Sequence, residues 1–316
     1  MTARALVIHP GSLGDVLLAA PAVAHLRSLG FDPVLAAAPR IASFLAAAGL
    51  AAGALDLEAL GLGSLFAGDP SPAARAALAG HEAVVSWMGA ADETYRAALG
   101  RLGGPVVVAP SRPPAGERRH VADHLLATLA PLGPLPAWPP AVRLVPPAAD
   151  QAWAEGWLAE HGLPPAGTVL VHAGAGSLAK AWPGFSGLVR RLTDDGAGVV
   201  LSVGPADGEQ PGQAAPGRLA VARDLTLGRL AALAARTGAF VGNDSGPTHL
   251  AALVGCPTVA VFGSTDPARW APRGPHVRVV GGVVGWPGLD QVAEAVALSP
   301  TGRGGTRLRA LAAEVA

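Results

Sequence analysis

Short apolar runs alternate with Ala- and Leu-rich stretches of helical period from one end of the chain to the other. These runs lack an apolar and polar alternation, which is typical of parallel strands covered by helices on both faces. The order of strands and helices therefore predicts an α/β chain with parallel sheets. The predicted strands are 5–9, 33–38, 83–87 and 105–109, with a weaker one at 56–63, followed by 168–173, 198–204, 239–243, 258–263 and 277–282.

A proline-rich segment, residues 131–150, separates the two series of elements and contains seven prolines. Proline fixes φ and has no N–H group, so this segment should form a stiff linker rather than a helix or strand. A chain of 316 residues is long enough for two domains. We predict an N-terminal domain over 1–140, a second domain over 141–300 and a C-terminal tail with a short helix over 301–316.

Charge and cysteine content narrow the class of protein. Lys and Arg total 23 and Asp and Glu total 23, so no general field attracts nucleic acid, and we expect no nucleic-acid partner. The single cysteine, Cys256, excludes a disulfide framework and a cysteine-based zinc site. The chain has neither the pattern of a signal peptide nor an uninterrupted apolar stretch of membrane-spanning length. We expect a cytoplasmic monomer, with peripheral contact to the inner face of the cytoplasmic membrane left open.

Two residue types are almost absent. The chain is rich in Ala, Gly, Pro and Arg, whereas Lys180 is its only lysine and Asn243 its only asparagine. A surface lysine is easily replaced by arginine, but a lysine that acts as a compact, flexible point charge is not. Both residues are therefore candidates for function, with chance survival as the alternative.

The segment 224–272 is predicted to run helix, strand, turn, helix, strand and turn. Ser245 and Gly246 fall where a strand ends and a helix begins, so their N–H groups can face an anion such as a diphosphate. Asp244 is suited to accept hydrogen bonds from the hydroxyls of a sugar or ribose, and His249 could donate to a phosphate oxygen. The alternative is that Asp244 and Ser245 only cap the helix.

A second Gly-rich turn, HAGAGSLAKAWP, covers residues 172–183. Gly174 and Gly176 allow the backbone to approach a ligand closely, and Lys180 follows four residues later. The turn lacks the Gly-Lys-Ser/Thr triplet of a Walker loop. Lys180 is thus a candidate anion ligand, or a solvated residue at the start of a helix.

The first strand leads into HPGSLGDVLLAAP, residues 9–21. Ser12 and Asp15 have the spacing of a helix capping box, which would by itself explain both residues. Asp15 also follows the carboxyl end of a strand, where an exposed carboxylate could act as a general base. Gly11 and Gly14 would keep that approach open to a substrate. Both interpretations remain open at this point.

Three stretches in this order, GSLGDVLLAAP, HAGAGSLAKAWP and VGNDSGPTHLAALVGCPTVAVFGSTDP, resemble glycosyltransferase family 9, the ADP-heptose:lipopolysaccharide heptosyltransferases and their relatives. The resemblance runs from residue 5 to about residue 295. It implies the GT-B architecture, in which two Rossmann-like domains with parallel sheets face each other across a cleft. The N-terminal domain would hold the acceptor and the C-terminal domain the nucleotide-sugar donor. It also implies inverting, metal-independent transfer.

Carried over by position, the resemblance makes Asp15 the catalytic base and Lys180 a phosphate ligand. The residues assigned to the donor sugar and diphosphate are Lys180, Asp244, Ser245, Gly246, His249, Gly14 and Ser12. In the nucleoside site, either Asp207 or Glu209 would meet the ribose and Leu225 would lie against the base.

The acceptor side is less defined. The segment 118–133 resembles the family's acceptor-domain helix, and Arg118, Arg119 and His120 would grip an anionic acceptor or else form a solvated basic turn. Many relatives carry an arginine before the first turn, where this chain has His9 and Pro10.

The implied function is inverting transfer of a heptose-like sugar from a nucleoside-diphosphate sugar, expected to be ADP-linked, to a hydroxyl of a cell-envelope glycan or glycolipid. The nucleotide sugar is then a co-substrate, with no resident cofactor and no metal. A nucleotide-sugar epimerase of GT-B architecture and a non-catalytic nucleotide-sugar-binding protein are the alternatives. A dinucleotide oxidoreductase is disfavoured because the first strand is not followed by G-x-G-x-x-G, and a serine hydrolase because G-x-S-x-G is missing.

Overall fold

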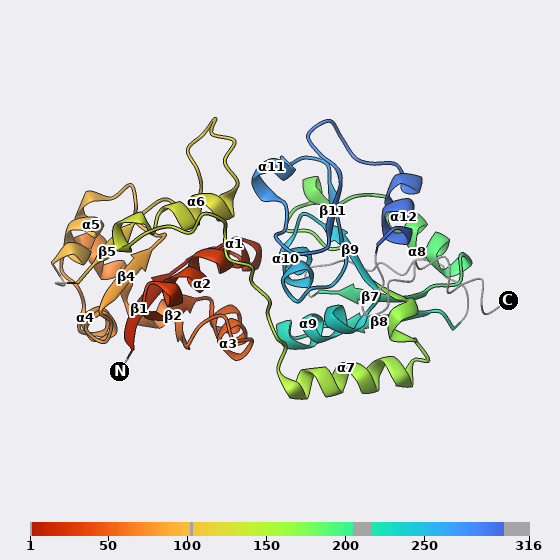
Figure 1. Ribbon diagram of the computed structural model, residues 1–316, viewed down its shortest axis with the longest axis horizontal. Helices are drawn as coiled ribbons and strands as arrows, with labels where there is room; N and C mark the ends of the chain where they lie inside the picture. Colours follow the sequence, from red (N-terminus) through yellow and green to blue (C-terminus); the bar gives the residue numbers. More distant parts are fainter. Residues whose placement is uncertain (1, 102–103, 205–216, 300–316) are drawn as a thin grey trace. The chain divides into compact units, whose positions relative to one another are not determined.

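The computed structural model describes residues 2–101, 104–204 and 217–299. The chain forms two compact units, and the boundary between them lies between Leu144 and Val145. Figure 1 shows both units, with most of their helices and strands labelled. Each unit is built on a sheet of parallel strands covered by helices, as the unbroken apolar runs predict.

The described part of the N-terminal unit holds a five-stranded sheet in the order β3-β2-β1-β4-β5. All neighbouring strands are parallel, and in register Leu6 of β1 lies opposite Val34 and Val84. The strands are β1 (Ala3–Ile8), β2 (Phe31–Ala37), β3 (Gly53–Asp56), β4 (Ala83–Ser86) and β5 (Val106–Val108).

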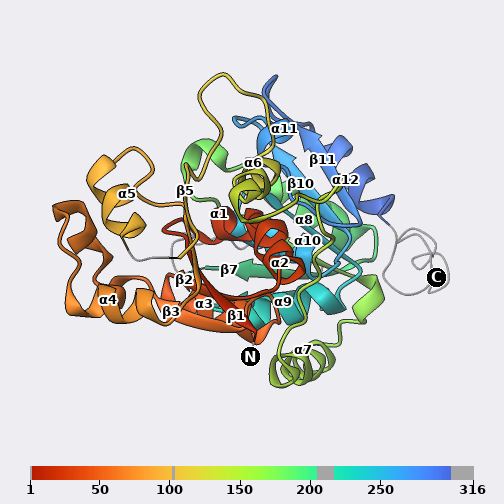
Figure 2. The same ribbon diagram turned by 60° about the vertical axis from the view of Figure 1, so that its left-hand side comes forward.

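Several helices of this unit begin at a residue whose side chain caps them. Ser71 accepts a hydrogen bond from the N–H of Ala74, and Asp92 accepts one from Tyr95. In Figure 2, α4 and α5 lie on one side of the sheet and α2 and α6 on the other. The helices are α1 (Leu13–Leu18), α2 (Ala20–Ser28), α3 (Pro39–Ala47), α4 (Pro72–Ala79), α5 (Glu93–Gly100) and α6 (Val121–Ala127), with 3-10 turns η1 (Glu58–Leu60), η2 (Leu62–Ala67) and η3 (Ala130–Leu132).

The described part of the C-terminal unit holds a six-stranded sheet in the order β11-β10-β9-β6-β7-β8, again parallel throughout. Its strands are β6 (Thr168–His172), β7 (Gly198–Val203), β8 (Leu219–Arg223), β9 (Ala239–Asn243), β10 (Thr258–Phe262) and β11 (Val277–Gly281). The helices are α7 (Ala148–Glu160), α8 (Phe185–Asp194), α9 (Leu227–Arg236), α10 (Gly246–Leu253), α11 (Pro267–Trp270) and α12 (Leu289–Ala297), with turns η4 (Pro165–Gly167) and η5 (Leu178–Lys180).

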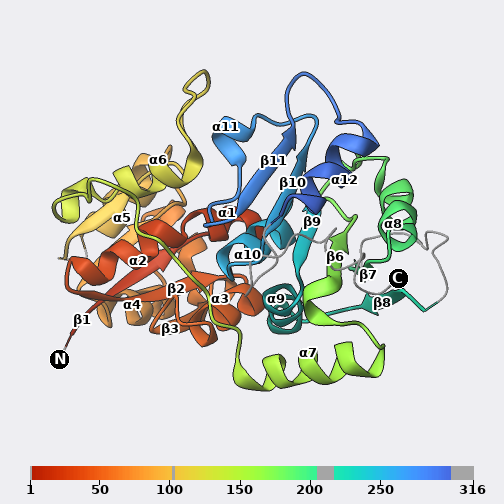
Figure 3. The same ribbon diagram turned by 45° about the vertical axis from the view of Figure 1, so that its right-hand side comes forward.

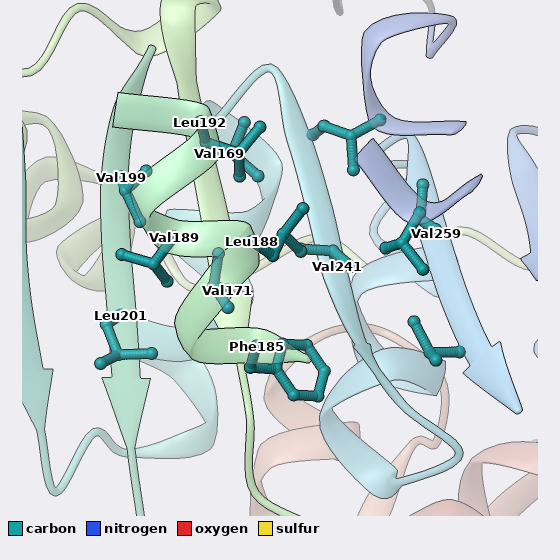
Figure 4. Packing of buried hydrophobic residues seen from close by; sticks show 14 of the residues in the cluster. Val169, Val171, Phe185, Leu188, Val189, Leu192, Val199, Leu201, Val241 and Val259 are labelled. Carbon is teal, nitrogen blue, oxygen red and sulfur yellow. The ribbon is translucent and has the colours of Figure 1, made fainter. Parts of the chain in front are cut away.

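One face of this sheet is covered by α8 and α12, as Figure 3 shows. Phe185 and Leu188 of α8 pack onto valines of β6 and β9 such as Val171 and Val241, all of them at most 3% exposed (Figure 4). Burying one such side chain contributes about 1.5–3 kcal/mol, so this layer fixes the central strands firmly. The strand ends from which the following loops start are therefore held in place.

The predicted α/β class with parallel sheets is confirmed, and nine of the ten predicted strands coincide with strands of the structure. The prediction of a strand at 56–63 is wrong, because β3 ends at Asp56 and 3-10 turns follow. β8 was not predicted, since its residues LAVAR alternate in burial and end on a charge. The prediction of irregular structure through 131–150 is also wrong at its end, where α7 begins at Ala148 directly after Pro147. The predicted tail helix, 301–316, lies outside the described residues.

Candidate functional site

The order of strands changes direction between β6 and β9 in the C-terminal unit. From β6 the sheet continues through β7 to β8, whereas β9 starts the series that runs to β11. In open α/β sheets, ligands bind at the carboxyl ends of the strands beside such a switch point. The loop after β6 carries Lys180 and the turn after β9 carries Asp244, so both candidate residues lie at this edge.

Lys180 and Asp244 form an ion pair, with 2.7 Å between Nζ and Oδ2. The same Oδ2 accepts a hydrogen bond from the hydroxyl of Thr265 at 2.8 Å. The Asp244 side chain is only 7% exposed, whereas that of Lys180 is 34% exposed. The buried carboxylate of Asp244 thus anchors the ammonium group of Lys180, whose side chain remains partly accessible to a ligand.

His249, in the first turn of α10, lies close to the same carboxylate, with 3.8 Å between Nε2 and Asp244 Oδ1. Burial raises the pKa of Asp244, but the imidazole of His249 and the ammonium of Lys180 outweigh it and hold that pKa below its usual value. Asp244 is therefore ionised at neutral pH. This cluster of Lys180, Asp244, Thr265 and His249 is called the β9 cluster below.

Ser245 precedes α10 as its N-cap residue, with extended backbone angles. The first intrahelical hydrogen bonds are donated by Thr248 and His249, so the N–H groups of Ser245 and Gly246 precede the hydrogen bonds of the helix. The side chain of Ser245 forms no capping hydrogen bond, and its hydroxyl lies 3.4 Å from that of Thr248. Helix capping therefore does not account for Ser245, nor for Asp244, whose carboxylate is bound by Lys180 and Thr265.

The residues predicted for the nucleoside are only partly described. Leu225 is half-buried between β8 and α9, at the same carboxyl edge of the sheet. Asp207 and Glu209 lie outside the described residues.

In the N-terminal unit, strand order changes direction between β1 and β4, and the turn after β1 leads into α1. Asp15 Oδ2 accepts hydrogen bonds from both the N–H and the hydroxyl of Ser12, at 3.2 and 2.8 Å. Its Oδ1 accepts one from Arg112 at 3.2 Å. Gly14 is half-buried at the second position of α1. Asp15 therefore has the local contacts of a helix-capping residue, and a guanidinium beside it.

Two titratable groups meet in this turn. Burial raises the pKa of Asp15, but the Ser12 hydrogen bonds and the Arg112 guanidinium outweigh it and hold that pKa below its usual value. Burial also lowers the pKa of His9 to about 4, so its ring is neutral. His9 Nδ1 accepts a hydrogen bond from the N–H of Gly11, which fixes the tautomer with the proton on Nε2. The turn thus presents an ionised carboxylate beside a neutral imidazole.

The three residues predicted for the acceptor stand directly before α6. Arg118 and Arg119 are exposed, and Arg119 pairs with Glu117 at 2.9 Å. His120 is 8% exposed and its Nδ1 caps α6 by accepting from the N–H of Ala122. His120 thus has a structural contact of its own, whereas the side chains of the two arginines are exposed to solvent.

Two contact residues were not predicted from the sequence. Thr265 lies in the turn after β10, and the adjacency of β9 and β10 in a parallel sheet is the signal that could have placed it beside Asp244. Arg112 is 97 positions from Asp15, in a proline-rich loop, and the sequence offers no signal for that pairing.

Across 2–101, 104–204 and 217–299, no group of three or more His, Cys, Asp or Glu side chains is arranged to hold a metal ion. Within the same ranges, no helix combines the length and the apolar character needed to cross a bilayer.

The sequence of the C-terminal unit is similar to that of known glycosyltransferases. Residues 153–294 match the model of glycosyltransferase family 9 (heptosyltransferase). Over 113 residues the chain is 33% identical to lipopolysaccharide heptosyltransferase 3 of Escherichia coli, and the match spans 33% of each protein. The matched part is thus a third of the length of that relative.

Solved structures match nearly the whole chain. A family 9 glycosyltransferase from Veillonella parvula is 19% identical with a TM-score of 0.70, covering 99% of this chain and 96% of that one. The ADP complex of the Escherichia coli heptosyltransferase WaaC is 20% identical with a TM-score of 0.59, covering 93% and 97%. These similarities confirm the predicted GT-B fold class. The resemblance seen in the motifs is confirmed over residues 153–294, where this chain is similar to glycosyltransferase family 9.

Proposed function

We propose that this protein is an inverting glycosyltransferase that moves a heptose-like sugar from an ADP-linked donor to a hydroxyl of a cell-envelope glycan or glycolipid. The observation that carries the proposal is the β9 cluster beside the N-terminus of α10, at the switch point of a unit that matches family 9. The ADP-bound heptosyltransferase with the same fold supports the choice of nucleotide.

The donor diphosphate is assigned to Lys180, the N–H groups of Ser245 and Gly246, and His249. As the sugar leaves, negative charge grows on the diphosphate, and fixed positive groups stabilise that charge without reorganising. Asp244 positions the Lys180 ammonium through a contact of 2.7 Å, and the helix dipole adds to its field. These groups supply the stabilisation, so the transfer is proposed to need no metal ion.

Asp244 is assigned a double role. It anchors Lys180 through Oδ2, and its Oδ1, which lies 3.8 Å from His249 Nε2, is assigned to accept a hydrogen bond from a donor hydroxyl. An ionised carboxylate with a lowered pKa is an acceptor only, which suits a hydroxyl and not a phosphate.

Asp15 is assigned as the general base. Its carboxylate takes the proton of the acceptor hydroxyl while that oxygen attacks the anomeric carbon from the face opposite the diphosphate, so that the configuration inverts. The turn keeps Asp15 ionised and 20% exposed, as a base must be before the reaction. The mechanism requires the N-terminal unit to present this carboxylate to a donor held by the C-terminal unit.

The test is a transfer assay with ADP-heptose and a lipopolysaccharide-core acceptor, with ADP release and the anomeric configuration of the product as readouts. We expect ADP release only with the acceptor, an inverted product and no loss of rate in a metal chelator. Donor conversion without acceptor would indicate an epimerase. Donor binding without turnover on any acceptor would indicate a binding protein.

A further inference from the structure

Asn243, the last residue of β9, is fully buried and uses every hydrogen-bonding atom of its side chain. Its Nδ2 donates to the carbonyl oxygens of Ala173 at 2.8 Å and Gly174 at 3.2 Å. Its Oδ1 accepts from the N–H of Trp182 at 2.9 Å. All three partners belong to the loop between β6 and α8, so one side chain of a neighbouring strand binds this loop at two places.

The two places are the beginning and the end of the loop, and Lys180 lies between them. The intervening residues have little packing of their own, since Leu178 is 93% exposed and the only regular structure is the short turn η5. The geometry of the loop therefore depends on the closure of its base. Asn243 closes it.

The end of the loop is held firmly by Trp182. Its indole is buried, its Nε1 donates to the carbonyl oxygen of Pro287 at 3.0 Å, and its ring packs edge-on against Phe185. Asn243 thus connects the beginning of the loop to a fixed point of the core. The backbone carbonyl oxygen of Asn243 also accepts a hydrogen bond from the hydroxyl of Thr248 on α10. This contact connects the end of β9 to the helix that follows Asp244.

Few side chains can make these contacts. The loop base needs two N–H donors for carbonyl oxygens and one acceptor for an N–H, all within reach of one short side chain. The asparagine amide has this set, whereas an aspartate has no N–H and a hydroxyl has a single donor. This requirement explains why the chain keeps asparagine at this one position.

We propose that Asn243 is a positioning residue that fixes the loop so that the Lys180 ammonium stands beside Asp244, ready for a diphosphate. The inference rests on the proposed function for its ligand, and on the three hydrogen bonds for its geometry. Asn243 itself does not contact the diphosphate. Its effect on binding is exerted through Lys180.

The experiment is a double-mutant cycle in the full-length chain, with ADP affinity measured by calorimetry for N243A, K180M and the double variant. We expect N243A to weaken ADP binding about 3- to 30-fold, as residues coupled through one network do. The double variant should then bind no more than about twofold more weakly than K180M, because the two losses share one cause. Amide hydrogen exchange of residues 175–181 should become faster in N243A without any ligand.

The matched control is T258V, which removes a buried hydroxyl whose hydrogen bond to the carbonyl of Cys256, at 2.8 Å, lies at the opposite end of the neighbouring strand. It should change neither the ADP affinity nor the loop exchange. If N243A does not fold, N243D keeps the acceptor for Trp182 and removes the donors, and it should show the same effects.

Several results would overturn the inference. They are wild-type ADP affinity in folded N243A, losses that multiply in the double variant, unchanged loop exchange, or failure of both Asn243 variants to fold. Failure of the proposed donor site looks different: the wild-type protein would not bind ADP, while the loop exchange would still respond to N243A.

Discussion

The turns after β1 and β6 share a sequence pattern, strand, His and a Gly-rich stretch, but they are built differently. The first passes from Ile8 into α1 at Leu13 within a few residues, whereas the second takes from His172 to Phe185 before α8 begins. A short turn can place a side chain that belongs to the helix itself, as Asp15 does. A long loop can extend a lysine to a neighbouring strand, as Lys180 does.

The contacts that hold the two turns differ in sequence range. In the first turn, His9 holds Gly11 and Asp15 holds Ser12, all within a few residues. In the second, the partner of Trp182 is Asn243, 61 positions away. The contacts of the acid are therefore mostly local, with the exposed Arg112 as a distant one, whereas the loop of the cation depends on a neighbouring strand, so perturbing the sheet should affect donor binding before it affects the base.

The largest expected effect is the loss of activity on changing Asp15, beside the short turn that leads from β1 into α1. D15N keeps an acceptor for Ser12 but cannot take a proton, so kcat should fall about 100- to 10,000-fold while ADP affinity stays unchanged. ADP release and calorimetry measure the two quantities. As control, S71A removes a capping hydrogen bond of α4 in the same unit and should cost about 0.5–2 kcal/mol of stability while leaving kcat unchanged. An equal loss of ADP affinity in D15N would show that Asp15 serves only the turn.

In the long loop between β6 and α8, the change that corresponds to D15N is K180M. A hydrogen bond to a charged group contributes about 1.5–3 kcal/mol, so ADP affinity should fall roughly 10- to 150-fold. R190M, on the exposed face of α8, removes the same charge type from the same unit and should leave affinity unchanged. If both variants bind ADP equally, the ammonium of Lys180 does not contact the diphosphate.

The sequence predicted the strands and the residues that follow them because these depend on local pattern. Unbroken apolar runs identify buried parallel strands, and their carboxyl ends locate Asp15, Lys180 and Asp244 at sheet edges. β8 was missed because it is an edge strand with alternating burial, for which a buried-strand pattern is the wrong criterion.

What the sequence did not predict are contacts made across the sheet. Asn243 was noticed as the only asparagine, but its role depends on carbonyl groups brought to it by β6, and backbone carbonyls carry no sequence signal. Thr265 and Arg112 likewise gain their partners only when separate loops meet. The reactive side chains can thus be found from the sequence, whereas the residues that orient them are found only from the tertiary structure.

Crowding in the short turn gives a prediction on stability. A Cβ at Gly11 would stand 2.6 Å from Asp15 Cβ and 2.7 Å from His9 Cε1, so G11A forces the turn apart. Overpacking of this kind costs about 1–3 kcal/mol in the free energy of unfolding, measured by urea denaturation. In the same unit, G80A has nothing within 4 Å of its new methyl and should change that free energy little. Equal stability of the two variants would show that the turn relaxes freely.

The smallest effect concerns the guanidinium beside the base. Arg112 helps to hold the pKa of Asp15 below its usual value, so the carboxylate stays ionised, and its stabilising contacts persist, until the pH falls through that lowered pKa. In R112A that pKa should rise, and the acidic limb of kcat/KM should move to higher pH. Because the Arg112 side chain is 59% exposed, the pair contributes about 0.2–1 kcal/mol, equivalent to less than about one pH unit.

The measurement is a pH profile of kcat/KM for R112A and for R75A, with circular dichroism confirming the fold at each pH. R75A removes another exposed arginine of the N-terminal unit, one that pairs with Asp69 instead. Its profile should match that of the wild-type protein. A limb that moves equally in both variants would indicate a change in overall charge, and a limb that stays fixed in R112A would mean that the group titrating there is not Asp15. Only a shift confined to R112A assigns the limb to the carboxylate of the short turn.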